Sequence, residues 1–93
     1  MASQIRKALE EITAIEQVIK PYEYYTADVS DSLRDLAAIK ELLNNPTKAN
    51  LAQAMEKLKA VENRIYRYRG YEPAEEALRH INTLKEMAKS YGV

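Results

Sequence analysis

The 93-residue chain is short enough for one domain and has the composition of a globular protein, with 46% hydrophobic and 30% charged residues. Cysteine is absent, which excludes disulfide bonds, thiolate nucleophiles and sulfur ligands for metals. No apolar run approaches the roughly 18–20 residues that cross a bilayer, and the N-terminal segment reaches acidic residues before any signal-like apolar stretch. We therefore expect one soluble, cytoplasmic domain over residues 1–93.

The formal net charge is zero, but the charges are unevenly divided along the chain. Residues 1–45 hold 5 basic and 8 acidic side chains, whereas residues 46–93 hold 9 basic and 6 acidic ones. Nucleic-acid-binding domains usually carry net positive charge, because neutralising phosphates supplies much of their affinity. The neutral balance favours a protein partner, and RNA or DNA binding by the basic C-terminal half is the alternative.

The first predicted element is an amphipathic helix over residues 4–20, followed by a kink or a turn at Pro21. Proline disfavours helical geometry at the residue before it and has no N–H to donate. The apolar residues of this helix recur three and four positions apart, as on one helix face. They are Ile5, Ala8, Leu9, Ile12, Ile15 and Ile19.

The second predicted helix covers about residues 28–44, with Asp28 or Ser30 as its N-cap. A helix that begins at Pro21 is the alternative. Apolar residues continue at helical spacing through the whole stretch. They are Tyr22, Tyr25, Val29, Leu33, Leu36, Ile39 and Leu43.

The segment "PYEYYTAD", residues 21–28, contains three tyrosines. Tyr22 and Tyr25 fit the apolar stripe and are expected to anchor in the core, whereas Tyr24 does not fit it. A loop that begins at Pro21 would instead leave all three rings partly exposed.

A third helix is predicted from the segment "NNPTKAN", where Asn45 can cap a helix whose first position is Pro46. Gly70 supplies the left-handed conformation that commonly ends a helix. The expected core stripe is Leu51, Ala54, Leu58, Val61, Ile65 and Tyr68.

Glu72 and Pro73 predict the start of a fourth helix, with Glu75 and Glu76 near the positive end of its dipole and Gly92 at its end. Because long helices with short connections pack as antiparallel neighbours, the sequence predicts an all-α, up-down-up-down four-helix bundle. The expected core residues of the fourth helix are Ala77, Leu78, Ile81, Leu84, Ala88 and Tyr91.

The segment "NRIYRYRGYEP", residues 63–73, gathers three arginines and three tyrosines. Tyr68 continues the buried stripe of the third helix, whereas Tyr66 falls on the opposite, solvent side. Arg64 and Arg67 flank the stripe, so we expect their stems to lie along it and their charged heads to stay in water. One interpretation is therefore a capped helix end with one core tyrosine and basic flanks.

The other interpretation is a binding surface. Tyrosine and arginine are enriched at the hot spots of protein interfaces, and both also stack on unpaired bases. We predict that Tyr66, Arg69 and Tyr71 contact a partner, with Arg67 beside them and Tyr24 as a second exposed ring. The expected partner is another protein, with nucleic acid as the alternative. A homodimer across a two-fold axis also remains open.

Catalytic and metal chemistry is sparse in this sequence. His80 is the only histidine, and Glu76 four residues before it does not give the paired Glu-x-x-His motifs of di-iron bundles. Asp28, Asp31 and Asp35 share a helical ridge that can gather Mg²⁺, but helix caps and first turns favour the same residues. We expect no catalytic residues, no metal, no cofactor and no enzymatic activity.

Residues 33–92 resemble the bacteriocin immunity proteins of the enterocin A immunity type. The likeness consists of a helix ending in "IKELLNNP", a third helix in "NLAQAMEKLKAVENRIYRY", a loop with proline, and "EEALRHINTLKEMAKSYG". It implies a soluble, antiparallel four-helix, non-enzymatic protein that protects a bacteriocin producer from inside the cell. The family's recognition surface would fall on the end of the third helix, the following loop and the last helix. The chain departs from the family in its neutral charge, because members tend to be basic.

Overall fold

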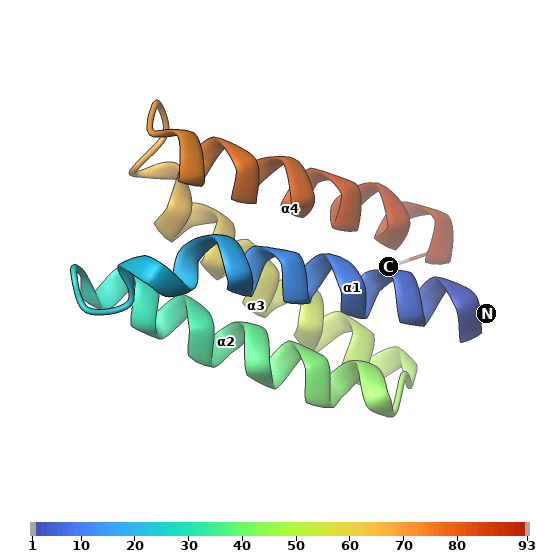
Figure 1. Ribbon diagram of the computed structural model, residues 1–93. Coiled ribbons are helices and arrows are strands. Elements are labelled where there is room, and N and C mark those ends of the chain that lie inside the picture. Colours follow the sequence, from blue (N-terminus) through green and yellow to red (C-terminus); the bar gives the residue numbers. More distant parts are fainter. Residues whose placement is uncertain (1, 93) are drawn as a thin grey trace.

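The computed structural model describes residues 2–92, which form four long helices joined by short connections (Figure 1). The helices are α1 (Ala2–Ile19), α2 (Ala27–Asn44), α3 (Lys48–Tyr66) and α4 (Glu72–Tyr91), and a short 3₁₀ turn, η1 (Lys20–Tyr22), follows α1. No strand occurs in residues 2–92, and none of their helices is long and apolar enough to cross a membrane. The predicted all-α class is confirmed.

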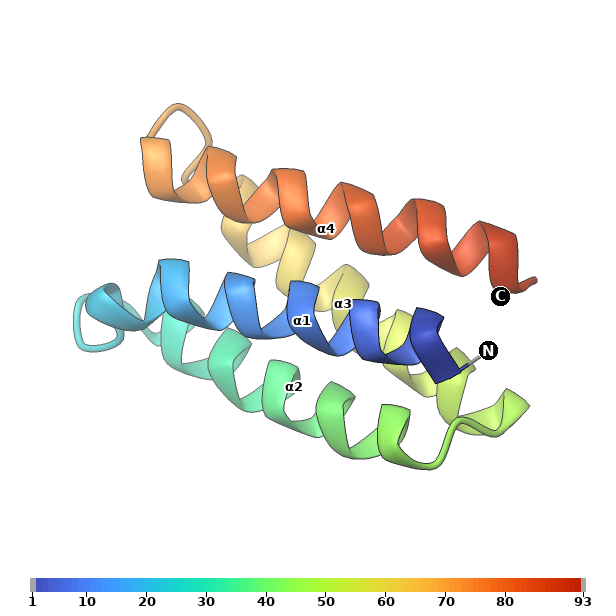
Figure 2. The same ribbon diagram turned by 45° about the vertical axis from the view of Figure 1, so that its right-hand side comes forward.

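Successive helices run in opposite directions, so the chain forms the predicted up-down-up-down bundle (Figure 1). The bundle measures 36 × 20 × 18 Å, and α1 packs most extensively against α4, and α2 against α3. The α1–α2 and α3–α4 connections lie at one end, whereas the α2–α3 connection and the two ends of the described chain lie at the other (Figure 2). The two ends of the molecule are therefore formed by different segments of the chain.

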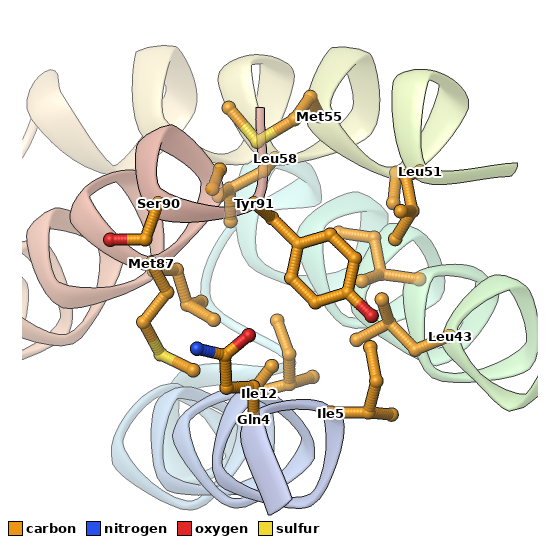
Figure 3. A pocket seen from close by; sticks show the side chains of 15 residues that line it. Gln4, Ile5, Ile12, Leu43, Leu51, Met55, Leu58, Met87, Ser90 and Tyr91 are labelled. Atoms are coloured by element: carbon orange, nitrogen blue, oxygen red, sulfur yellow. The ribbon is translucent and has the colours of Figure 1, made fainter. Parts of the chain in front are cut away.

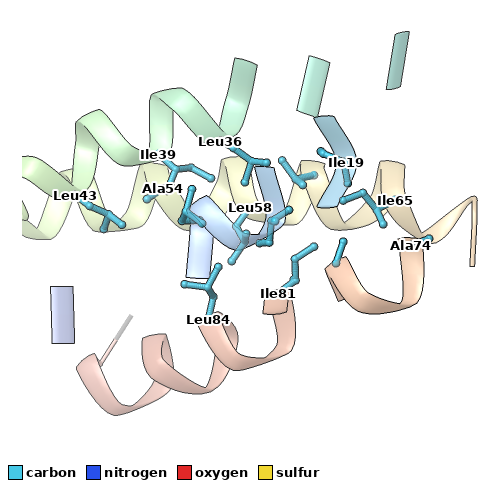
Figure 4. Packing of buried hydrophobic residues seen from close by; sticks show 14 residues of the cluster. Ile19, Leu36, Ile39, Leu43, Ala54, Leu58, Ile65, Ala74, Ile81 and Leu84 are labelled. Atoms are coloured by element: carbon cyan, nitrogen blue, oxygen red, sulfur yellow. The ribbon is translucent and has the colours of Figure 1, made fainter. Parts of the chain in front are cut away.

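The core is a single apolar cluster with contributions from all four helices (Figure 4). Burying these side chains supplies most of the stability of such a bundle, because isolated helices of this length are marginal in water. Every buried apolar residue lies on a predicted stripe except Ala74. Other stripe residues are only partly buried, namely Ile5, Ala8, Leu9, Val29, Leu33, Leu51, Tyr68, Leu78, Ala88 and Tyr91. The buried set is Ile12, Ile15, Ile19, Leu36, Ile39, Leu43, Ala54, Leu58, Val61, Ile65, Ala74, Ala77, Ile81 and Leu84.

One polar side chain lies among these apolar ones. Ser32 on α2 is fully buried, and its Oγ has no hydrogen-bond partner among the described residues. A buried hydroxyl without a partner has lost its hydrogen bonds to water and gained none in return. Ser32 is therefore a local weakness in an otherwise apolar core.

The N-terminus of α2 differs from the prediction. Thr26, rather than Asp28 or Ser30, is the N-cap: its backbone is extended, and its Oγ1 accepts the backbone N–H of Asp28 at 3.0 Å. A continuous helix from Pro21 is also wrong, because that proline lies in η1 and is followed by a turn. The expected turn at Pro21 is confirmed.

The helix α3 begins at Lys48, later than the predicted start at Pro46. Thr47 is the N-cap and its Oγ1 accepts the backbone N–H of Asn50 at 3.1 Å, so Asn45 and Pro46 lie before the helix. The Asn45 carbonyl is occupied by the Thr47 N–H and by the Asn50 side chain, both at 2.8 Å. Asn45 and Thr47 both have side chains that can cap a helix, and Thr47 is the one that does so here.

The α3–α4 connection begins with a tighter, 3₁₀-like turn. After Tyr66 the backbone N–H groups of residues 67–69 bond three residues back, as in a 3₁₀ turn. Gly70 then takes a left-handed φ of 98°, which a side chain would strain. Its N–H donates to Glu75 Oε2 at 2.9 Å, so this carboxylate joins the first turn of α4 to the connection. Gly92 caps the end of α4 as predicted, with φ of 85°.

Candidate functional site

The two connections at one end of the bundle contain most of the aromatic side chains. Residues 20–26 and 66–71, which we call the tyrosine-rich end, hold six of the seven tyrosines. Tyr91 belongs to the opposite end. The chain has no phenylalanine or tryptophan, so its aromatic surface is concentrated at one place. The six are Tyr22, Tyr24, Tyr25, Tyr66, Tyr68 and Tyr71.

Five of these six rings face solvent. The exposed fraction is 94% for Tyr24, 81% for Tyr25, 71% for Tyr71, 53% for Tyr66 and 40% for Tyr22. In residues 2–92 these five are all of the large hydrophobic side chains that are exposed. Scattered exposed apolar residues are ordinary, but their confinement to one end is not.

The α1–α2 connection does not follow the helical stripe on which the sequence placed it. Tyr22 and Tyr25 were predicted to anchor in the core, and this prediction is wrong, because the turn after Pro21 ends the helical register. Their two rings pack on each other instead, with centroids 6.1 Å apart. Tyr24 is the most exposed of the tyrosines, as its position off the stripe predicted.

Tyr68 joins the two connections from the inside. Its ring packs against the core, and its hydroxyl donates to Asp28 Oδ2 at 2.8 Å. The Thr26 Oγ1 atom lies 3.0 Å from the hydroxyl oxygen of Tyr68, and Arg67 Nη1 donates to Asp28 Oδ1 at 3.0 Å. One carboxylate at the start of α2 is therefore bonded to two side chains from the turn that follows α3. This network holds the two connections together.

Arg69 and Tyr66 form the stacked pair on the outer side. The Arg69 guanidinium carbon lies 4.3 Å from the centroid of the Tyr66 ring, and Nη1 donates to the Tyr66 carbonyl at 3.0 Å. A cation over an exposed ring is worth about 0.5–1 kcal/mol, enough to favour one orientation of both side chains. Arg69 has no carboxylate within 4 Å in residues 2–92, so its charge is available to a partner.

The other two arginines of the segment are engaged within the molecule. Arg64 Nη1 lies 2.8 Å from Asp35 Oδ2, and both side chains are less than one quarter exposed. The expectation that the Arg64 head stays in water is wrong, because Asp35 lies opposite it on the adjacent helix. Arg67 is 66% exposed and stays at the surface, but it is bonded to Asp28.

The acidic ridge of α2 is likewise committed to ion pairs. Asp35 binds Arg64 of α3, Asp28 binds Arg67 just after α3, and Asp31 lies 3.2 Å from Arg34 on its own helix. His80 Nδ1 lies 2.8 Å from Glu11 Oε1 of α1, not from a carboxylate on its own helix. In residues 2–92 no three acidic or histidine side chains are placed to hold a metal ion.

The structure therefore sorts the five predicted partner-binding residues into three groups. Tyr66 and Arg69 are stacked on each other, Tyr71 lies on the same connection, and Arg67 is directed to α2. Tyr24 lies at the same end of the bundle on the other connection (Figure 2). The exposure of Tyr22 and Tyr25 agrees with the alternative that the sequence left open, a loop that begins at Pro21. The Thr-Ala-Asp capping signal after this proline favours the same loop.

Comparisons with protein-family models, with curated proteins and with solved structures find no match for this chain. The resemblance to bacteriocin immunity proteins stays a prediction.

Proposed function

We propose that this chain is a small, non-enzymatic, cytoplasmic protein-binding bundle whose tyrosine-rich end contacts the partner. The observation that carries the proposal is the confinement of all exposed large hydrophobic side chains in residues 2–92 to that end. Tyrosine is enriched at binding hot spots because it offers a large apolar face and a hydrogen-bonding hydroxyl. It also has few rotatable bonds to immobilise, which lowers the entropic cost of association.

The support beneath the rings favours binding. Asp28, held by Tyr68 and Arg67, ties the two connections to each other, so their backbone is preorganised. A surface that is already ordered loses less conformational entropy when a partner binds. The connections are short, and Thr26 caps the helix that follows one of them.

The charges at this end indicate the chemistry of the partner. Lys20 and Glu23 lie 3.2 Å apart, and Arg79 and Glu72 lie 3.3 Å apart, so these charges are balanced within the molecule. Arg69 is not balanced in this way. A complementary protein surface would place apolar side chains against the rings and a carboxylate against Arg69.

The most specific form of the proposal is a protective or inhibitory factor similar to bacteriocin immunity proteins. Its support is the resemblance of residues 33–92 and the four-helix architecture. The region that the family would use for recognition overlaps Tyr66, Arg69 and Tyr71 at the end of α3 and in the following connection.

Nucleic-acid binding has weaker support. Two basic side chains of the C-terminal half that could contact phosphates, Arg64 and Arg67, are instead paired with Asp35 and Asp28. A third, Lys89, lies in the last turn of α4, at the far end of the bundle from Arg69. The basic half of the sequence therefore does not gather its charges on one face.

Affinity capture from a lysate of the native cells, repeated with nuclease, tests the proposal. We expect the wild type to enrich a protein in both conditions, and Tyr66→Ala combined with Arg69→Ala to lose it while retaining its circular dichroism and melting curve. Lys48→Ala, which also removes one positive charge but lies beside the α2–α3 connection, is the matched control and should retain capture.

Three outcomes contradict the proposal. Retained capture by the folded double variant would move the site away from Tyr66 and Arg69. Loss of capture on nuclease treatment, with affinity falling steeply with salt, would identify nucleic acid as the partner. Capture of a second copy alone, with a monomer formed by the double variant, would identify the surface as a homodimer interface.

A further inference from the structure

The end of the bundle opposite the tyrosine-rich end contains an apolar pocket of about 140 Å³ (Figure 3). All four helices line it, from the first turns of α1 and α3 and the last turns of α2 and α4 towards the middle of the bundle. It shares no residue with the tyrosine-rich end, so what it does is independent of the function proposed above.

Three of the helices contribute an alanine to the lining of the pocket. Ala8 on α1, Ala54 on α3 and Ala88 on α4 all line it, where larger residues would close the space. An unfilled cavity in a core costs stability in proportion to its volume. A bundle that keeps alanine at three such positions retains room for another molecule.

The lining has one chemical character inside and another at the rim. The interior is aliphatic, with the flexible thioethers of Met55 and Met87, and no lining residue carries a charge. The polar lining residues are Gln4, Ser90 and Tyr91, in the first turn of α1 and the last two turns of α4, and the first two are exposed. Figure 3 shows the Tyr91 ring lying across the pocket and the Gln4 amide beside it.

This arrangement determines the size and class of the occupant. An apolar cavity of about 150 Å³ holds a molecule the size of benzene, with six carbon atoms. Methionine side chains adapt to varied apolar shapes, because they are unbranched and polarisable. A rim that has amide and hydroxyl groups but no lysine or arginine suits an uncharged hydrogen-bonding head better than an anion.

We propose that this pocket binds a small uncharged amphiphile, with about six carbon atoms inside and a hydroxyl or carbonyl group at the rim. The alkyl chain of the ligand lies inside the pocket, against Leu58, Leu84 and the methionines. Its polar head stays near Gln4, Ser90 and Tyr91.

The test is a titration of the wild type with straight-chain primary alcohols from butanol to decanol, followed by the NMR shifts of the Met55 and Met87 methyl groups. Each added methylene should tighten the dissociation constant about fourfold until the pocket is full. The dissociation constants of still longer alcohols should then agree within about twofold. A continued increase to decanol would indicate partition into a nonspecific apolar surface, and the absence of saturable shifts would indicate no site; either result overturns the proposal.

A filling variant locates the site. Ala54→Leu should weaken hexanol binding at least tenfold, because the new side chain takes the volume of the ligand. Ala52→Leu is the matched control, since it makes the same substitution on the exposed side of the same helix and should change binding less than twofold. If circular dichroism shows Ala54→Leu to be unfolded, Ala88→Leu fills the pocket from α4. Unchanged binding in a folded filling variant overturns the proposal.

The head group is tested at constant chain length. Hexanol should bind more tightly than hexanoate and hexylammonium, by at least about threefold. Equal or tighter binding of either ion would contradict an uncharged ligand, whatever the result of the chain-length series.

Discussion

The two ends of the bundle differ in where their apolar surface lies. At the tyrosine-rich end, the core closes at Ile19, Ile65 and Ala74, and the aromatic rings beyond this layer face outward. At the other end, small and flexible residues leave a space among the helices, which Tyr91 partly covers. The same four-helix scaffold therefore carries an outward aromatic surface and an inward apolar pocket.

Truncating core leucines at the pocket end should have the largest effect. Leu58→Ala and Leu84→Ala each remove a side chain that is less than 10% exposed and enlarge an existing cavity. We expect each to lower the free energy of unfolding by roughly 2–5 kcal/mol, as measured by chemical denaturation. A loss below about 0.5 kcal/mol at both positions would contradict the packing of this end.

Tyr68 tests the inner layer of the opposite end. Tyr68→Ala should lower the free energy of unfolding by about 3 kcal/mol, because it removes a ring packed on the core and the hydroxyl that Asp28 accepts. Tyr66→Ala, two residues earlier, should change it by less than about 0.5 kcal/mol, since that ring is mainly exposed. Similar losses for the two variants would mean that the end has no distinct inner and outer layers.

Two ion pairs with different exposure should have smaller effects on stability. Arg64→Ala should lower stability by roughly 1–3 kcal/mol, because Asp35 would be left largely buried without its partner. Arg34→Ala breaks a solvent-exposed ion pair with Asp31. It should lower the free energy of unfolding by less than about 0.5 kcal/mol, as is usual for surface pairs. Equal effects in thermal melts would show that the Arg64 pair is no better shielded than the Arg34 pair.

Ser32→Ala is the smallest change and the one expected to stabilise. The substitution removes a buried hydroxyl without a partner and adds a better helix former, so we expect a gain of up to about 1 kcal/mol. The denaturation midpoint should rise with an unchanged slope. A loss of more than about 1 kcal/mol would indicate that the hydroxyl has a partner, such as an ordered water molecule.

The helices and their buried faces could be predicted because a helix with one core-facing stripe repeats its apolar residues every three to four positions. Residues such as Leu58 and Ile81 are therefore buried where periodicity placed them. The caps were harder to predict, because Thr26 competes with Asp28, and Thr47 with Asn45, and local propensity does not rank them well enough.

The candidate site was predicted only in part, because periodicity predicts exposure only where the helix continues. Tyr66 and Tyr24 fall off a stripe and are exposed, but Tyr25 continues a stripe that the turn at Pro21 interrupts. Pairs such as Arg64 with Asp35 join residues on different helices and depend on how those helices face each other. The pocket is harder still, because it is the volume left over by side chains of all four helices.

The most direct test of the central claim is backbone hydrogen exchange, measured on the chain alone and in complex with the protein it captures. Bound partner shields the amides that it covers, and amides in short connections otherwise exchange readily. The proposed function predicts slower exchange over residues 66–71 and in the α1–α2 connection, with residues 44–50 unchanged. Slower exchange confined to residues 44–50 and the end of α4, with the tyrosine-rich end unchanged, would contradict it.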